Sequence, residues 1–165
     1  MNLRSLPAVA ALLVVTAVPL ADAAAPKITS KGVGRVKLGR TFQRLHDAHL
    51  IGHLRKGCEL AGPKLRVAKL RAPLKGSVEF FKPKLKAFQI TVTGGARARG
   101  VGVGSTVAQI KAAFPKAKVD HSGEQVFGLT FVNIPKRGGG KLQFGVSTQT
   151  RKTTMIGIPS LAFCE

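Results

Sequence analysis

The stretch "VGVGSTVAQIKAAF" at residues 101–114 decides the fold, because a similar stretch, "VKLGRTFQRLHDAH", occurs at residues 36–49. Each has an apolar residue, a glycine, one variable residue and a threonine before a segment with helical apolar periodicity. Aligning their glycines places Thr41 on Thr106. Threonine is a good helix N-cap. The two stretches therefore predict two equivalent strand–helix junctions, and with them a duplicated fold.

The second copy has the stronger helix signal. In "TVAQ" the Thr106 hydroxyl can accept a hydrogen bond from the Gln109 amide while the Gln109 side chain reaches back, which is a capping box. Pro115 is expected to end this helix. The first copy has Arg44 in place of the glutamine, so it keeps only its threonine cap. Its helix is expected to end at Gly52.

Alternating apolar and polar residues predict strands around both helices. Residues 62–76 are expected to be irregular or one short strand, and the basic, glycine-rich residues 94–100 a flexible linker. We expect an α+β domain of two strand–helix–strands repeats, at about 31–93 and 100–165, with two short helices against a largely antiparallel sheet. The predicted strands are residues 33–38, a hairpin of 77–81 with 85–93, and residues 117–120, 125–135 and 141–147.

Residues 1–23 have the three parts of a secretory signal peptide. The charged start "MNLR" precedes the apolar run "LPAVAALLVVTAVPL", and "ADA" at residues 21–23 is a small-residue cleavage site. The run is short for a membrane helix, which needs about 20 apolar residues. We therefore expect a secreted or envelope-associated protein whose mature part, residues 24–165, is one domain without a transmembrane segment.

Cys58 and Cys164 are the two cysteines of the chain. In an exported protein, a small and even number of cysteines most simply indicates a disulfide. We therefore expect Cys58 to pair with Cys164. A zinc site would need two further ligands, and no C-x-x-C spacing supports one.

The charge is strongly positive: 27 Lys and Arg against 7 Asp and Glu give a net charge of +20. Cations spaced by apolar residues suggest the solvent face of strands. Such a surface attracts anionic envelope polymers, acidic proteins and, non-specifically, nucleic acid. The alternative is that the source organism's exported proteins are generally basic. Cations are densest around "KLRVAKLRAPLK" and "KPKLK", and the candidate anion-binding residues are Lys64, Arg66, Lys69, Arg71, Lys75, Lys82, Lys84 and Lys86.

The stretch "LHDAHLIGH" places His46, His49 and His53 on one stripe of the predicted first helix. Two of the spacings between these histidines suit the binding of zinc or copper. In the alternative that we favour, His49 aligns with Phe114 and lies at the edge of the core, and Gly52 ends the helix before His53. We expect no metal or other cofactor, and these three histidines are the residues to test.

Catalytic patterns are scarce. Residues 120–124, "DHSGE", contain Asp, His, Ser and Glu in a row. Members of a catalytic triad come from separate elements that converge in space, so this stretch is more simply the tip of a hairpin. A secreted hydrolase with a histidine-based site is the alternative function.

The "GxT" before a short amphipathic helix, followed by a strand meander, resembles the repeat of β-lactamase-inhibitor-like proteins and of the small lipoproteins of the outer-membrane assembly machinery. The ending "IPSLAFCE", together with "GVGVGSTVAQIKAAFP", also resembles uncharacterised secreted proteins of actinobacteria. This resemblance implies a binding module without catalytic residues, or a protein inhibitor.

The chain contains no Trp and no Tyr, although stacking on aromatic side chains usually supports sugar and single-strand nucleic-acid recognition. Electrostatic binding needs no such platform. The leading hypothesis is a secreted, non-enzymatic module that contacts an anionic surface or partner.

Overall fold

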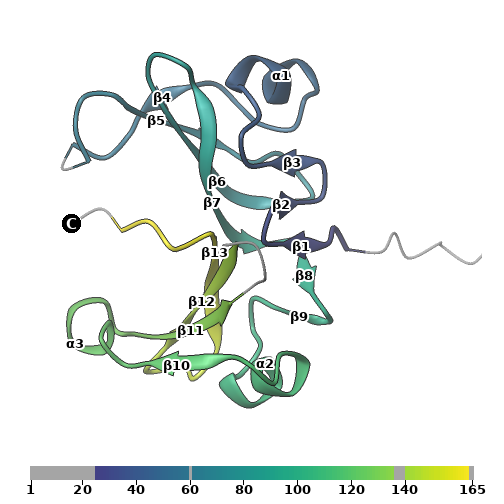
Figure 1. Cartoon of the computed structure of the whole chain (residues 1–165), viewed down its shortest axis with the longest axis vertical. Coiled ribbons are helices and arrows are strands. Elements are labelled where there is room, and N and C mark those ends of the chain that lie inside the picture. The colour runs from purple at the N-terminus through teal and green to yellow at the C-terminus, as the bar shows by residue number, and fades with distance from the viewer. Residues whose placement is uncertain (1–24, 60, 136–139, 164–165) are drawn as a thin grey trace, which may run out of the picture.

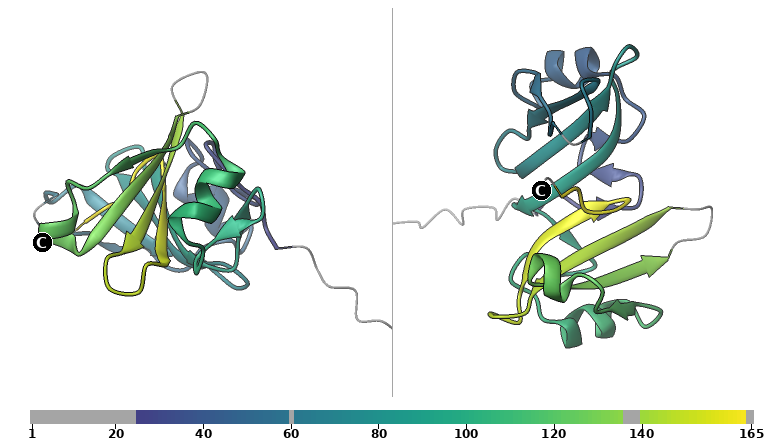
Figure 2. Two further views of the ribbon diagram at one scale, coloured as in Figure 1. Left: turned by 90° about the horizontal axis from the view of Figure 1, so that it is seen from below. Right: turned by 90° about the vertical axis from the view of Figure 1, so that its left-hand side faces the viewer.

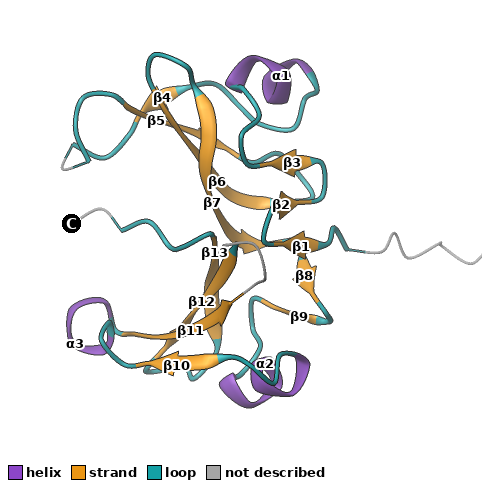
Figure 3. Cartoon of the chain, in the orientation of Figure 1, coloured by secondary structure: helices purple, strands orange, loops and turns teal. Residues whose placement is uncertain are grey.

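A computed structural model describes residues 25–59, 61–135 and 140–163 (Figure 1). The predicted signal peptide and Cys164 lie outside the described residues. The fold class is confirmed as α+β, since short helices accompany a large antiparallel sheet (Figure 3).

The large sheet has eight strands in the order β10-β11-β12-β13-β7-β6-β5-β4. Every neighbouring pair in it is antiparallel. β13 and β7 are neighbours at the centre of the sheet. On the β13 side lie β12, β11 and β10, and on the β7 side lie β6, β5 and β4. Each half of the chain therefore supplies one half of the sheet. The strands are β4 (Arg55–Lys56), β5 (Leu65–Lys69), β6 (Lys75–Phe81), β7 (Lys86–Gly94), β10 (Lys118–Asp120), β11 (Leu129–Pro135), β12 (Lys141–Ser147) and β13 (Thr153–Ile158).

Two small sheets and two helices lie on one side of the large sheet (Figure 1). One small sheet precedes α1 along the chain and the other precedes α2, so each helix enters from a short hairpin. We call the opposite side of the large sheet the open face; α3 lies on that side. The elements are β1 (Ile28–Thr29), β2 (Gly32–Val33), β3 (Val36–Lys37), α1 (Phe42–Asp47), β8 (Arg97–Ala98), β9 (Val101–Gly102), α2 (Val107–Ala113) and α3 (Glu124–Phe127).

Both helices begin at the predicted threonines. Thr41 Oγ1 accepts a hydrogen bond from the Arg44 amide at 3.4 Å. The capping box predicted for the second helix is present, with Thr106 Oγ1 accepting from the Gln109 amide at 3.3 Å and Gln109 Oε1 from the Thr106 amide at 2.9 Å. Each cap satisfies helix-end amides that have no partner within the helix.

The main core lies between the helices and the large sheet. Leu45 of α1 and Ile110 of α2 are buried against the apolar face of the strands. The rings of Phe42 and Phe80 meet edge to face at 5.8 Å. Because side chains alternate along a strand, the same strands present their polar residues to the open face. Fully buried strand residues include Val78, Phe80, Ile90, Val92, Phe144 and Ile156.

A second, smaller cluster lies on the open face of the second half, where residues 159–163 cross the sheet (Figure 2). Gln89 Nε2 donates to the Ser160 carbonyl at 2.8 Å, and the Leu161 amide donates to Gln143 Oε1 at 2.8 Å. Leu161 packs with Leu129 and Phe131. The end of the described chain therefore packs against part of the open face.

Two strand predictions are wrong because turns interrupt them. Residues 33–38 form the β2–β3 hairpin, with Gly34 at φ 51° in the turn. Residues 125–127 belong to α3, whose C-cap is Gly128 at φ 64°. A left-handed residue ends an extended or helical run.

The linker prediction for residues 94–100 is also wrong. These residues enter the β8–β9 hairpin, and Ala96 and Ala98 are buried. Residues 62–76 contain β5, which agrees with one short strand. The 77–81 and 85–93 hairpin is confirmed as β6–β7, but a bulge places Phe88 outside the core face. There it stacks on Phe81, with ring centroids 4.5 Å apart.

Candidate anion-binding site

A groove of about 560 Å³ runs over the open face of the first half. Strand alternation explains its lining: Ala68 of β5 is buried in the core, whereas its neighbours Val67 and Lys69 face the groove. Lys69 pairs with Ser77 across the sheet, and Ser77 pairs with Thr91. The groove is therefore a row of side chains across adjacent strands.

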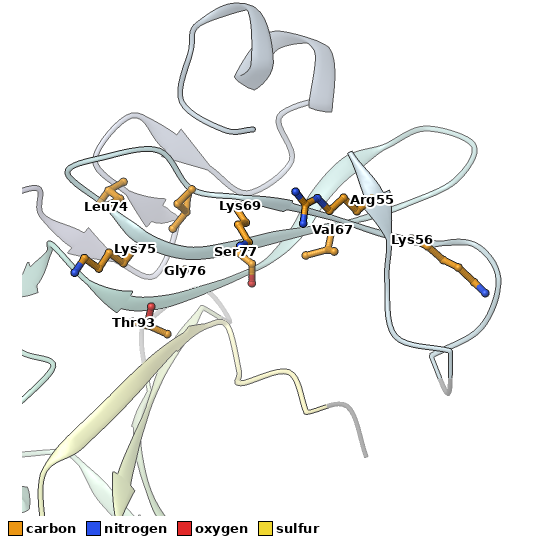
Figure 4. A pocket seen from close by; sticks show the side chains of 10 residues that line it. Arg55, Lys56, Val67, Lys69, Leu74, Lys75, Gly76, Ser77 and Thr93 are labelled. Carbon is orange, nitrogen blue, oxygen red and sulfur yellow. The ribbon is translucent and has the colours of Figure 1, made fainter. Parts of the chain in front are cut away.

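Four cations line this groove from three strands: Arg55 and Lys56 of β4, Lys69 of β5 and Lys75 of β6. In Figure 4, Lys75 and Lys56 lie at the two ends of the row, and Lys69 and Ser77 lie between them. Lys56 Nζ forms an ion pair with Glu59 Oε1 at 2.8 Å. The other three cations form no ion pair with any described residue. Their charge is therefore available to an anionic ligand.

None of the described residues that line this groove is acidic. An acid enters only in the adjoining hollow of about 390 Å³, which shares Lys56, Val67 and Ser77 with the groove. This acid is Glu79, and burial raises the pKa of its carboxyl group. Cys58 also lines the hollow.

The candidate anion-binding residues from the sequence fall into different places. Lys69 and Lys75 line the groove. Arg66 lies opposite buried Phe80 and donates to the carbonyl oxygens of residues 63 and 65, so it faces away from the groove. The others are exposed and do not line the groove: Lys64, Arg71, Lys82, Lys84 and Lys86.

Arg55 and Lys56 also line the groove, although they are not among the anion-binding residues predicted from the sequence. The basic stretch "LRKG" contributes them, but it is short and follows an irregular segment. Only the pairing of Arg55 with Val67 and of Lys56 with Arg66 brings them beside β5. Because β4 and β5 are separate segments of the sequence, no local pattern around Arg55 and Lys56 indicates that the two strands pair.

The predicted stripe of three histidines is wrong because α1 ends at Asp47. His49 takes φ 54° and is exposed, so it is not at the core edge. His46 stacks on Phe42 at 5.2 Å and lies 5.6 Å from the His53 ring. No group of three or more His, Cys, Asp or Glu side chains with the arrangement of a metal site is found in the described part of the chain.

The "DHSGE" stretch forms a hydrogen-bonded turn. Glu124 Oε1 accepts from Thr130 Oγ1 and contacts His121 Nδ1 at 2.6 Å, and these two partners, Thr130 first, lower the pKa of Glu124. Asp120 Oδ1 accepts from the Ser122 amide at 2.9 Å; bonds from Ser122 lower the pKa of Asp120. The carboxylate of Glu124 lies between the Thr130 hydroxyl and the His121 imidazole. His121 therefore does not activate Thr130 in the way that a general base activates a nucleophile.

Comparison with protein-family models, curated proteins and solved structures gives no match for this chain. No helix in the described residues has the length and apolar character needed to cross a membrane.

Proposed function

We propose that the protein is a secreted, non-enzymatic module that binds anionic polymers through the groove on the open face of its first half. The observation that carries this proposal is the row of Arg55, Lys69 and Lys75, which have no acidic partner among the described residues. On the other half of the open face, Leu161 of the C-terminal segment packs with Leu129 and Phe131.

The physical basis is electrostatic. A polymer with regularly spaced phosphate, sulfate or carboxylate groups releases bound counterions when protein cations neutralise those groups. The net charge of +20 attracts such a polymer from any side, and the groove gives it a defined track. Binding should therefore be tight at low salt and weak at high salt, with anions competing in order of their charge density.

Two triple variants of equal charge test whether the groove or the total charge governs binding. The first is Arg55→Gln, Lys69→Gln and Lys75→Gln; the second, at the β6–β7 turn, is Lys82→Gln, Lys84→Gln and Lys86→Gln. The probes are single-stranded DNA and heparin, titrated over a range of salt concentrations. Each anionic contact on single-stranded DNA contributes about 0.7 to the salt slope, so losing three lowers it by about 2.

We expect the salt slope of the groove variant to fall by about 2 and the salt slope of the turn variant to fall much less. Equal losses would favour the sequence-based hypothesis that diffuse charge, including the "KPKLK" turn, is what binds. Affinity retained at high salt, or strong preference between polymers of equal charge density, would overturn the non-specific mechanism. Circular dichroism of both variants checks that the fold is intact.

We also propose that the two halves are structural duplicates of the kind that the two "GxT" stretches predict. Thr41 and Thr106 support this, because both are N-caps of helices that follow a short hairpin. The strand order supports it further, because β4 to β7 form one half of the sheet and β10 to β13 form the other half. The likeness to β-lactamase-inhibitor-like repeats stays a hypothesis about fold, and fold alone does not indicate function.

A further inference from the structure

A separate, smaller hollow of about 190 Å³ lies on the other side of the β5–β6 turn from the groove. Its lining is mostly apolar, and three loops contribute to it: the β2–β3 turn, the residues after α1 and the β5–β6 turn. Compact apolar hollows with a few polar groups are typical of small-molecule sites. The apolar residues that line it are Pro26, Val36, Leu50, Ala72, Pro73 and Leu74.

Three of the residues that line this hollow have nitrogen-bearing side chains, one from each loop: Arg35, His49 and Arg71. All three are exposed, and none forms an ion pair with a described residue. None of the described residues that line the hollow is acidic. The two guanidinium groups therefore have no internal counter-charge at this place.

Backbone hydrogen bonds fix the three loops. The Gly34 amide donates to the Lys27 carbonyl at 3.0 Å, next to Arg35. The Arg71 amide donates to the Leu50 carbonyl at 3.0 Å, which ties two of the loops together. His49 is held in the left-handed region at φ 54°, a conformation that histidine tolerates better than most residues. The backbone that carries the three side chains is thus already ordered, which lowers the entropic cost of binding a ligand.

We propose that this hollow binds a small organic anion, a carboxylate attached to a compact apolar body. The carboxylate meets Arg35 and Arg71, whose planar guanidinium groups suit two-point hydrogen bonding, and His49 supplies a further N–H donor. The apolar body rests on Leu50 and Pro73. This site and its ligand are independent of the polymer-binding groove proposed above.

The size of the hollow sets the ligand class. At about 190 Å³ the hollow is much smaller than the groove of about 560 Å³. A single substituted ring or a branched short chain fits this space, whereas a nucleotide or a polymer segment does not. Burying the apolar body adds the affinity that a bare inorganic anion lacks.

The experiment measures binding of 4-fluorobenzoate by ¹⁹F NMR to the wild-type chain and to single variants. Arg35→Gln and Arg71→Gln should each weaken binding about tenfold or more, because a charged hydrogen-bond partner is lost. Arg71→Lys should lie between Arg71→Gln and the wild type, since it keeps the charge but loses the planar fork. Lys82→Gln, which removes an equal charge far from the hollow, should change affinity less than twofold.

Two matched ligands complete the test. Benzyl alcohol has the ring without the charge, and inorganic phosphate has the charge without the ring; both should bind at least tenfold more weakly than the fluorobenzoate. Equal weakening by Lys82→Gln, equal affinity for benzyl alcohol, or no saturable binding would each overturn the proposal. Heparin affinity should be nearly the same in Arg71→Gln as in Lys82→Gln, which separates this site from the groove.

Discussion

At the scale of single residues, Glu79 is the most informative side chain. It pairs with Val67 on one side and Gln89 on the other, in the middle of the open face of the first half. Burial disfavours its charged form and raises its pKa above 4.5. Among the described residues that line the hollow beside the cationic groove, it is the acid. Its protonation therefore affects both folding and the local charge.

Replacing Glu79 with Gln should change the pH dependence of stability. Because the carboxyl group binds its proton more tightly in the folded state, its favourable contribution is complete below pH 4.5 and is lost as pH rises through the folded pKa. The Glu79→Gln variant should thus unfold at higher urea concentration than wild type at neutral pH. The difference should disappear in acid.

Urea unfolding curves on both sides of pH 4.5 measure this, with Glu59→Gln as the exposed control. A wild type that is more stable than Glu79→Gln at neutral pH would mean that the nearby cations compensate the buried charge.

At the scale of elements, the two helices show how far a local signal reaches. Each cap joins residues three positions apart, so the sequence itself contains both partners of the hydrogen bond. The end of α1 has no such signal. Gly52 predicts the end of this helix, but the helix ends at Asp47, because Leu50 and Ile51 turn away to meet the residues just after β5. The Arg71 amide bonds the Leu50 carbonyl, and Ile51 bridges Leu70.

Removing the second helix cap with Thr106→Ala should lower the free energy of unfolding by about 1 kcal/mol. The reason is that the Gln109 amide loses its partner at the first turn of α2. Thr41→Ala should cost no more than this, because α1 has a single capping bond and no reciprocal one. Chemical denaturation measures both. Thr150→Ala, in an exposed turn, is the control, and an equal loss there would contradict the cap as the cause.

At the scale of the whole molecule, the two halves of the open face are different surfaces. Gly145 lies across from Met155 in the second half, and a Cβ on it would come within 2.9 Å of Leu161. The glycine thus makes room for the C-terminal segment. In the first half the open face carries the cations of the groove, which suit an anionic ligand rather than an apolar segment.

The C-terminal segment also bears on the predicted disulfide. Cys58 and Ala162 line the same hollow, and successive Cα atoms are about 3.8 Å apart. Ala162 is two residues before Cys164 in the sequence. Cys164 lies outside the described residues, so the Cys58–Cys164 pair stays a prediction.

Titration of the unfolded, unreduced protein should detect no thiols if the pair forms. Replacing Cys164 with Ser should then lower the free energy of unfolding by roughly 2–4 kcal/mol, because the unfolded chain is no longer closed into a loop. Detection of two thiols would contradict the pairing. The double variant of both cysteines separates the loss of the cross-link from the effect of exposing a single thiol.

The sequence by itself determined the features whose causes are local. The capped helix starts, the α+β class, the 77–93 hairpin and the positive charge each depend on residues close together in the chain. Only the tertiary structure decided which cations share a groove, since Arg55 reaches Lys69 through the pairing of β4 with β5. It also decided that residues 94–100 are ordered and that His49 joins Arg35 and Arg71. The physical reason is that strand register and loop convergence are set by contacts between distant segments, which no local pattern encodes.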